Sequence, residues 1–221
     1  MIAIVDYGMG NLRSAQKGFE RAGCETIITD DRVLIAEADA VVLPGVGAFR
    51  DCYEGLRARG LVDPVKEAAA SGRPFLGICV GLQLLFEGSE EGDAREGLGI
   101  FAGRVVRFPD AAQTGLKVPH MGWNRLERVP GRACPLLNEV AANPYTYFVH
   151  SYFARPADDE IVLATCEYGV RFPAIVGRAN VYAVQFHPEK SQSDGIAILR
   201  AFGNLIRQRT TANVQADTGA H

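Results

Sequence analysis

The first 80 residues alternate short apolar runs with segments in which apolar side chains recur at helical spacing. The apolar runs predict buried strands, and the periodic segments predict helices. The expected strands cover residues 2–6, 26–29, 39–43 and 75–78, and the expected helices begin near Asn11 and cover residues 50–58 and 64–71. A turn at Pro44–Gly45 is expected to end the third strand. Buried strands joined through helices form a parallel sheet that is covered by helices on both faces.

The second half of the chain has a different pattern, in which strand-like segments are separated by turn residues. These segments cover residues 104–108, 145–153 and 161–168, followed by a hairpin of residues 174–178 and 181–186 and a final helix that begins near Ser193. We therefore predict an α/β fold with a mostly parallel central sheet, helices on both faces and an antiparallel β extension. Residues 1–209 are expected to form a single domain, and the polar, aperiodic residues 210–221 a disordered tail.

Composition narrows the class of protein. Hydrophobic residues make up 48% and charged residues 22% of the 221 residues, as in ordinary globular proteins. The net charge of −3 gives no indication of a nucleic-acid or membrane partner. No apolar stretch is long enough to span a bilayer and the N-terminus lacks a basic leader, so a cytoplasmic location is expected. The five cysteines are odd in number, form no CxxC pair and have no zinc-ligand spacing, so neither a disulfide framework nor a structural metal is expected. No cofactor is expected either.

Cys79 differs from the other cysteines in its position along the chain. It directly follows the expected strand 75–78, lies in the run GICVG at residues 77–81, and precedes a helical segment. A strand–turn–helix elbow between glycines is typical of a nucleophile, with cysteine here in place of serine. The helix N-terminus favours the thiolate, and the N–H of Val80 can stabilise a developing oxyanion. Taken alone, the pattern fits a buried core cysteine equally well.

A histidine and a carboxylate follow the expected strand 181–186. Residues two apart in an extended chain point to the same side, so Glu189 can hold one ring nitrogen of His187 while the other faces the thiol. Pro188 is expected to keep this segment extended. Taken alone, the pair fits an exposed loop; combined with the elbow, it predicts a catalytic set of Cys79, His187 and Glu189.

Two other histidines compete for the role of base. His120 is expected in a loop rich in proline and glycine, and His150 lies inside an apolar strand. Neither has a carboxylate two residues further along the chain, so His187 is preferred.

Six motifs together resemble those of the class I, triad-type glutamine amidotransferases. The runs GICVGLQ (77–83), PGVGAF (44–49) and QFHPEKS (185–191) are similar to the nucleophile, oxyanion and histidine–glutamate segments of that class. The runs DYGMGNLRS (6–14), KVPHMGWN (117–124) and YFVHSY (147–152) resemble, more narrowly, the glutaminase subunits of imidazole glycerol phosphate synthase. The resemblance extends from residue 1 to about residue 206 and implies the fold of class I glutamine amidotransferases.

The resemblance implies a specific chemistry. Cys79 would attack the side-chain amide of glutamine, and His187 would protonate the departing ammonia and then activate the water that hydrolyses the thioester to glutamate. Ammonia would pass to a cyclase subunit, a (β/α)8 barrel, which makes imidazole glycerol phosphate and aminoimidazole carboxamide ribotide in histidine biosynthesis. The two subunits would form a heterodimer. The residues implied to face the cyclase are Asn11, His120, Met121, Trp123 and Lys190.

The remaining site residues are expected to bind glutamine and the oxyanion. The backbone N–H groups of Val46 and Gly47, which follow the third expected strand, join that of Val80 as oxyanion donors. Gln83, one helical turn beyond Cys79, is the first candidate to bind the amino-acid end of the substrate. Further candidates are Ser151 and Tyr152.

Three alternative functions remain open. The chain could serve another amidotransferase, but the DYGMGNL and PHMGWN runs argue against this. A non-catalytic interaction protein of the same fold would not need the set of Cys79, His187 and Glu189. A cysteine peptidase built on the same elbow is distinguished by testing peptides against free glutamine.

Overall fold

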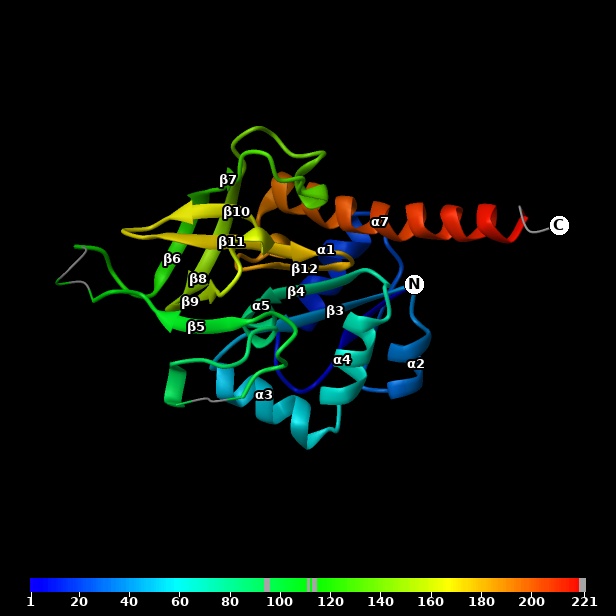
Figure 1. The fold of residues 1–221 in the computed structure, drawn as a ribbon, viewed down its shortest axis with the longest axis horizontal. Helices are drawn as coiled ribbons and strands as arrows, with labels where there is room; N and C mark the ends of the chain where they lie inside the picture. Colours follow the sequence, from blue (N-terminus) through cyan, green and yellow to red (C-terminus); the bar gives the residue numbers. More distant parts are fainter. Residues whose placement is uncertain (94–95, 111, 113–114, 219–221) are drawn as a thin grey trace.

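The computed structural model describes residues 1–93, 96–110, 112 and 115–218 and contains one large mixed sheet (Figure 1). Its strand order is β2-β1-β3-β4-β12-β11-β10-β7. The neighbours from β2 to β12 are parallel, and the pairs from β12 to β7 are antiparallel. The strands are β1 (Ile2–Val5), β2 (Thr26–Thr29), β3 (Ala40–Gly45), β4 (Phe75–Cys79), β7 (Glu127–Arg128), β10 (Val162–Glu167), β11 (Arg171–Arg178) and β12 (Val181–Val184). The predicted parallel sheet with an antiparallel extension is confirmed.

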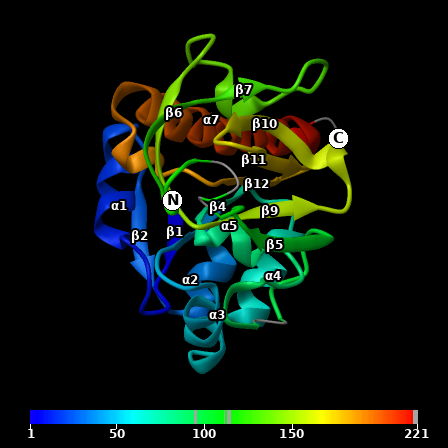
Figure 2. The same cartoon turned by 90° about the vertical axis from the view of Figure 1, so that its left-hand side faces the viewer.

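Helices cover both faces of this sheet. Figures 1 and 2 show α1 and α7 on one face, and α2, α3 and α4 on the other. The connection from β1 to β2 runs one way across the sheet, and the connection from β2 to β3 runs back the other way. Because both crossovers are right-handed, the helix in the first connection and the helix in the second lie on opposite faces. The helices are α1 (Leu12–Arg21), α2 (Arg32–Glu37), α3 (Phe49–Ala58), α4 (Val62–Ala70), α5 (Val80–Leu84) and α7 (Gln192–Thr218). None of the described helices is long and apolar enough to cross a membrane.

The last helix differs from the expectation for the end of the chain. The backbone of α7 stays helical to Thr218, across most of the segment from residue 210 for which a disordered tail was expected. The segment from Asn204 to Thr218 contains neither glycine nor proline, so no residue type in it interrupts a helix that has already formed. The expected tail residues 219–221 lie outside the described residues.

The antiparallel extension includes two small two-stranded sheets. One pairs β5 (Gly103–Arg107) with β9 (Tyr152–Pro156), and the other pairs β6 (His120–Arg125) with β8 (Tyr145–His150). The expected single strand 145–153 is therefore two strands, which separate at Ser151 and pair with different partners. The loop expected around His120 is instead part of strand β6, which also contains Trp123. Pro119 and Gly122 obscure this strand in the sequence, and its pairing with distant β8 creates it.

A cluster of aromatic rings joins the extension to the main sheet. Phe108 packs against Phe153 with ring centroids 4.8 Å apart and against Phe172 of β11 at 5.4 Å. Phe148 of β8 contacts Phe172 and also Phe186, at 5.8 and 5.7 Å. Because these rings come from both small sheets and from the main sheet, burying them fixes the extension over the carboxyl ends of the parallel strands.

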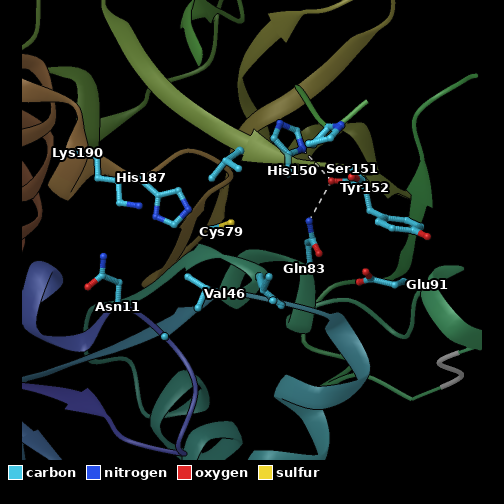
Figure 3. A pocket seen from close by; sticks show the side chains of 15 residues that line it. Asn11, Val46, Cys79, Gln83, Glu91, His150, Ser151, Tyr152, His187 and Lys190 are labelled. Carbon is cyan, nitrogen blue, oxygen red and sulfur yellow. Dashed lines mark hydrogen bonds between the residues drawn. The ribbon is translucent and has the colours of Figure 1, made fainter. Parts of the chain in front are cut away.

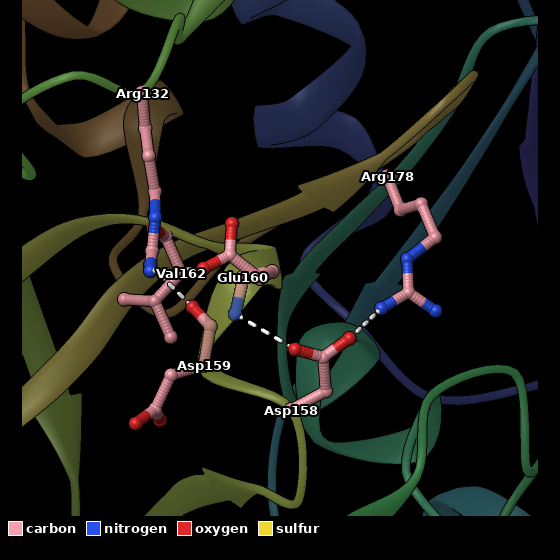
Figure 4. A network of polar contacts seen from close by, with 6 residues as sticks. All are labelled: Arg132, Asp158, Asp159, Glu160, Val162 and Arg178. Atoms are coloured by element: carbon pink, nitrogen blue, oxygen red, sulfur yellow. Dashed lines mark hydrogen bonds and ion pairs between the residues drawn. The ribbon is translucent and has the colours of Figure 1, made fainter.

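Arginine side chains hold the turn that leads into β10 (Figure 4). Arg132 donates hydrogen bonds to the carbonyl oxygens of Asp159 and, at 2.9 Å, Val162. Asp158 accepts a 2.9 Å bond from the N–H of Glu160 and forms an ion pair with Arg178. These contacts bind polar groups in and around the short 3-10 turn Asp159–Ile161, which precedes β10 in the antiparallel part of the sheet.

Candidate active site

Cys79 lies at a strained turn between strand β4 and helix α5. Its φ of 55° and ψ of −110° form a conformation that residues with a side chain rarely adopt. Glycines on both sides make the turn possible. A Cβ on Gly77 would lie 2.8 Å from the carbonyl oxygen of Gly81, and one on Gly81 would lie 1.9 Å from that of Leu43. The elbow predicted from the sequence is present, and its strain fixes the thiol at the end of the sheet.

The predicted histidine–carboxylate contact is also present, although the chain reaches it by a different path. His187 Nδ1 lies 2.8 Å from Glu189 Oε1, and both side chains are 2% exposed. The segment is not extended as expected, because Pro188–Lys190 forms a 3-10 turn directly after His187. Proline has a fixed φ that suits the first position of a helical turn, and this turn brings residue 189 back beneath the imidazole.

Two neighbours determine the charge of His187. Burial alone would lower its pKa, but hydrogen bonds with Cys79 and Glu189 and the negative charges of these two groups raise the pKa to about 10. The imidazolium is therefore the favoured form of His187 when the thiol of Cys79 is ionised. Such a pair can supply a nucleophile and a proton to the same reaction.

A cavity of about 650 Å³ opens in front of this pair. Figure 3 shows Cys79 and His187 near its middle, with Asn11 and Lys190 on one side and Gln83, Tyr152 and Glu91 on the other. The predicted site residues that line it are Asn11, Val46, Gly47, Cys79, Val80, Gln83, Ser151, Tyr152, His187 and Lys190. Glu189 lies behind the imidazole. The fold thus gathers segments that are more than 100 residues apart in sequence.

The strand that carries the predicted oxyanion donors is longer than the sequence suggests. β3 continues through Pro44 and Gly45, where a turn was expected, and pairs with β4 as far as Gly45 opposite Cys79. Pairing between β1 and β3 ends at Val42, so the imino nitrogen of Pro44 breaks no ladder with β1. Val46 and Gly47 consequently leave the sheet next to the thiol, where both line the cavity.

Gln83 is buried and has a fixed orientation. Its Nε2 donates to the carbonyl oxygen of Tyr152 at 3.0 Å and to Gln185 Oε1 at 3.2 Å. Both hydrogens of this amide group are therefore used, and its Oε1 remains as an acceptor. Gln185 in turn places its Nε2 3.9 Å from the sulfur of Cys79.

Sequence reasoning missed two polar residues of this site. Glu91 lines the cavity, and its Oε2 accepts a 2.8 Å hydrogen bond from the N–H of Phe49, the first residue of α3. It lies in an acidic stretch in which nothing distinguishes one carboxylate from its neighbours. Gln185 could have been found, because it stands two residues before His187 in the same run.

The residues expected to face a partner do not all lie at the surface. On β6, Met121 and Trp123 are 63% and 45% exposed, whereas His120 is 3% exposed. The ring of His120 stacks on those of Phe148 and Tyr168, with centroids 4.8 and 4.0 Å away. Strand alternation explains the difference: Met121 and Trp123 point to one side of β6 and His120 to the other. The expectation that His120 faces a partner is wrong.

Comparison with known proteins adds evidence that is independent of this geometry. Residues 3–204 match the family model of class I glutamine amidotransferases. The imidazole glycerol phosphate synthase subunit HisH of Syntrophotalea carbinolica is 55% identical over 93% of this chain and 100% of its own. The protein of the same name from Geobacter sulfurreducens is 51% identical over 92% and 98%.

Solved structures show the same fold at much lower sequence identity. A glutamine amidotransferase crystal structure superposes with a TM-score of 0.71 at 21% identity, covering 93% of this chain and 99% of the other. PurLQS from Thermotoga maritima gives 0.69 at 20% identity, covering 95% and 98%. Over nearly its whole length, the chain therefore belongs to the class I glutamine amidotransferases and, among them, to the family of imidazole glycerol phosphate synthase HisH subunits.

Proposed function

We propose that this chain is the glutaminase subunit of a cytoplasmic imidazole glycerol phosphate synthase. It hydrolyses glutamine to glutamate and ammonia. Ammonia passes to a cyclase subunit that forms imidazole glycerol phosphate and aminoimidazole carboxamide ribotide in histidine biosynthesis. The observation that carries this proposal is the elbow thiol of Cys79 beside an imidazole that Glu189 holds at 2.8 Å, in a cavity large enough for an amino acid.

The reaction divides into two steps at one carbon atom. The Cys79 thiolate attacks the side-chain amide carbon of glutamine, and backbone N–H groups of Val80 and of the segment 46–47 receive the negative oxygen. His187 donates its proton to the leaving nitrogen, so ammonia departs and a γ-glutamyl thioester remains. His187, now neutral, removes a proton from water as the water attacks the thioester. Glutamate leaves, and the thiolate–imidazolium pair is restored.

The two ends of the cavity suit the two ends of glutamine. Near one end, Glu91 and the Oε1 of Gln83 can accept hydrogen bonds from the α-ammonium group, beside Ser151 and Tyr152. The amide then reaches Cys79 at the middle. Ammonia is released toward the side on which Asn11 and Lys190 lie (Figure 3). This orientation favours a partner that docks over that end of the cavity.

Chemistry also favours a docked partner. Ammonia in water at neutral pH becomes mostly ammonium, which is not a nucleophile, so a closed path to the acceptor protects it. The exposed apolar side chains of Met121 and Trp123 lie on β6, whose paired strand β8 leads into the cavity lining at Val149 and His150. We assign the cyclase contact to these two residues together with Asn11 and Lys190. His120 supports the strand from beneath.

The test is a glutamine-dependent assay of the chain co-purified with a cyclase subunit, measuring glutamate and imidazole glycerol phosphate together. Cys79→Ala is expected to abolish both products from glutamine, while ammonium salts still support the cyclase. Cys166→Ala removes a buried thiol elsewhere in the fold and serves as the matched control, with activity expected to stay at the wild-type level.

Each alternative function gives a different result in this assay. Glutamate release by the Cys79→Ala complex would mean that another residue attacks the amide. Glutamate without imidazole glycerol phosphate would assign the chain to another amidotransferase. Cleavage of peptides in place of free glutamine would make it a cysteine peptidase, and a wild-type complex that forms without any glutamine hydrolysis would make it an interaction protein.

A further inference from the structure

Two buried side chains from separate parts of the chain form hydrogen bonds to the backbone of the segment that leads from β3 into the cavity. The hydroxyl of Tyr7, which follows β1, donates a 2.6 Å hydrogen bond to the carbonyl oxygen of Pro44. The thiol of Cys52, on α3, donates to the carbonyl oxygen of Val46 at 3.3 Å. Tyr7 is 1% exposed and Cys52 is fully buried. Neither residue lines the cavity, and the reaction described above uses neither of them.

The two side chains also contact each other and remain protonated. Burial raises the pKa of Tyr7 well above its usual value, and nearby Cys52 adds to this effect. Burial likewise raises the pKa of Cys52 to about 11, although the neighbouring Tyr7 hydroxyl and the backbone of Val46 oppose the shift. At neutral pH both groups therefore keep the hydrogen that each donates to the segment 44–46.

Packing leaves this segment little freedom to move. A Cβ on Gly45 would lie 2.7 Å from the nitrogen of Gly81, 2.8 Å from Val80 Cβ and 3.0 Å from the hydroxyl oxygen of Tyr7. The segment is therefore wedged between the elbow on one side and Tyr7 on the other. Helix α3 also packs tightly against Tyr7. A Cβ on Gly55 of this helix would lie 2.8 Å from the carbonyl oxygen of Tyr7.

The bond from Cys52 determines which way a neighbouring N–H points. The carbonyl of Val46 and the N–H of Gly47 belong to one trans peptide unit, so they point in opposite directions. Cys52 holds the carbonyl toward α3, and the N–H of Gly47 then points away from α3. If this peptide turned over, a carbonyl oxygen would take the place of that donor and would repel a developing oxyanion.

We propose that Tyr7 and Cys52 are positioning residues that fix the peptide groups of residues 44–47 so that an N–H donor faces the oxyanion formed at Cys79. This inference rests on the proposed glutaminase function. It assigns a role to two residues that never touch the substrate. The hydroxyl and the thiol act through backbone orientation, so their loss affects the step in which the oxyanion forms more than it affects substrate binding.

The test compares two reactions of the same thiol in the complex with the cyclase subunit. Glutamine hydrolysis passes through an oxyanion, whereas alkylation of Cys79 by iodoacetamide does not. Tyr7→Phe and Cys52→Ala are expected to lower kcat for glutamine by about tenfold or more, with KM changed by less than about twofold. The alkylation rate of Cys79, followed by mass spectrometry of its peptide, is expected to stay at the wild-type value.

Conservative and matched variants separate positioning from folding. Cys52→Ser keeps a hydroxyl donor and is expected to restore most of kcat. Tyr168→Phe removes a hydroxyl that donates to the backbone of Lys117 at 2.8 Å, and Cys166→Ala removes a buried thiol; both are expected to leave kcat unchanged. If Cys52→Ala does not fold, Tyr7→Phe and Cys52→Ser still decide the question.

Three results would overturn the inference. The first is a wild-type kcat in both Tyr7→Phe and Cys52→Ala. The second is an equal loss of alkylation and hydrolysis, which would locate the defect in the elbow. The third is a Cys52→Ser variant as slow as Cys52→Ala. Failure of the proposed function is recognised separately, because the wild-type complex itself would then not hydrolyse glutamine.

Discussion

His187 is held by a carboxylate two residues further along the chain, and its charge depends on that neighbour and on Cys79. Burial disfavours the imidazolium, whereas the hydrogen bonds and charges of Cys79 and Glu189 favour it more strongly, so the pKa is raised to about 10. A group whose pKa rises on folding stabilises the folded state fully below its unfolded pKa of about 6.5. That contribution is lost as the pH rises through about 10.

Glu189→Gln is expected to lower the pKa of His187 by about one unit or more, because the amide keeps the shape of the side chain but removes its negative charge. The measurement is an NMR titration of the His187 ring. Glu167→Gln, at an exposed carboxylate elsewhere, is the control and should leave that pKa unchanged. An unchanged pKa in Glu189→Gln would mean that Cys79 alone determines the charge of the imidazole.

Single residues of the site differ in how far the sequence reveals them. Cys79 and His187 are found because each follows an apolar run and stands in a short run of distinctive residue types. The sequence does not reveal three further residues, because each forms a hydrogen bond with a backbone group that only the tertiary fold brings near. These residues and the separations of their partners along the chain are Tyr7 at 37 residues, Cys52 at 6 and Glu91 at 42. Local pattern contains no information about such pairs.

At the scale of elements, the pairing of β6 with β8 buries two histidines in contact. Asn124 Nδ2 lies 3.3 Å from His120 Nε2, and His120 Nδ1 lies 3.1 Å from His150 Nε2. His150 Nδ1 lies 2.8 Å from the carbonyl oxygen of Tyr152. That carbonyl can only accept, so each ring donates through Nδ1 and accepts through Nε2. Burial lowers the pKa of His120 to about 4 and that of His150 to about 3.

This pair makes stability depend on pH in a defined direction. The unfolded chain binds protons at both histidines below about pH 6.5, and the folded chain does not, so stability is present above pH 6.5 and is lost as the pH falls. Between pH 7 and 5 we expect a loss of about 2 kcal/mol per ring in the free energy of unfolding.

Urea unfolding at pH 7 and pH 5 measures this difference, and His150→Gln should make it smaller because one titrating ring is removed. A difference as large in His150→Gln as in the wild type would assign the pH dependence to other groups.

Strands and helices could be predicted where the apolar pattern of the sequence matches the burial of the same residues in the fold. The apolar runs of β1, β2 and β4 lie in the parallel part of the sheet, and their residues match the expected strands closely. Helix α2 was missed because its six residues are too few to show periodicity, although Asp31 caps it by accepting a 2.8 Å bond from the N–H of Val33. Strand β6 was missed because its half-exposed residues form a strand only against β8.

The topology of the whole molecule explains why the site lies where it does. Loops after β1, β3, β4 and β12 meet at the carboxyl ends of parallel strands, at the point where the strand order reverses. An α/β pattern predicts this edge before any contact is known. The position of the antiparallel extension was not predictable, because strands separated by tens of residues form its two small sheets.

Docking of the partner subunit is expected to depend on Trp123. A half-exposed indole on an open strand can be buried completely by a partner, and such aromatic anchors often contribute about 2 kcal/mol or more to binding. Trp123→Ala should therefore weaken the complex by about thirtyfold or more, measured by titration calorimetry. Val33→Ala, at an exposed apolar residue of α2, is the control and should bind normally. Equal affinities would place the interface elsewhere.

The same indole gives the molecule an optical property. Trp123 is the only tryptophan in the chain, and its ring lies 6.1 Å from that of Tyr147 on the partially solvated face of β6. Ultraviolet light at the red edge of protein absorption therefore excites a single fluorophore. When a partner without tryptophan removes water from this face, the emission moves to shorter wavelength. The unlabelled chain thus carries its own reporter of assembly, which can be followed in real time.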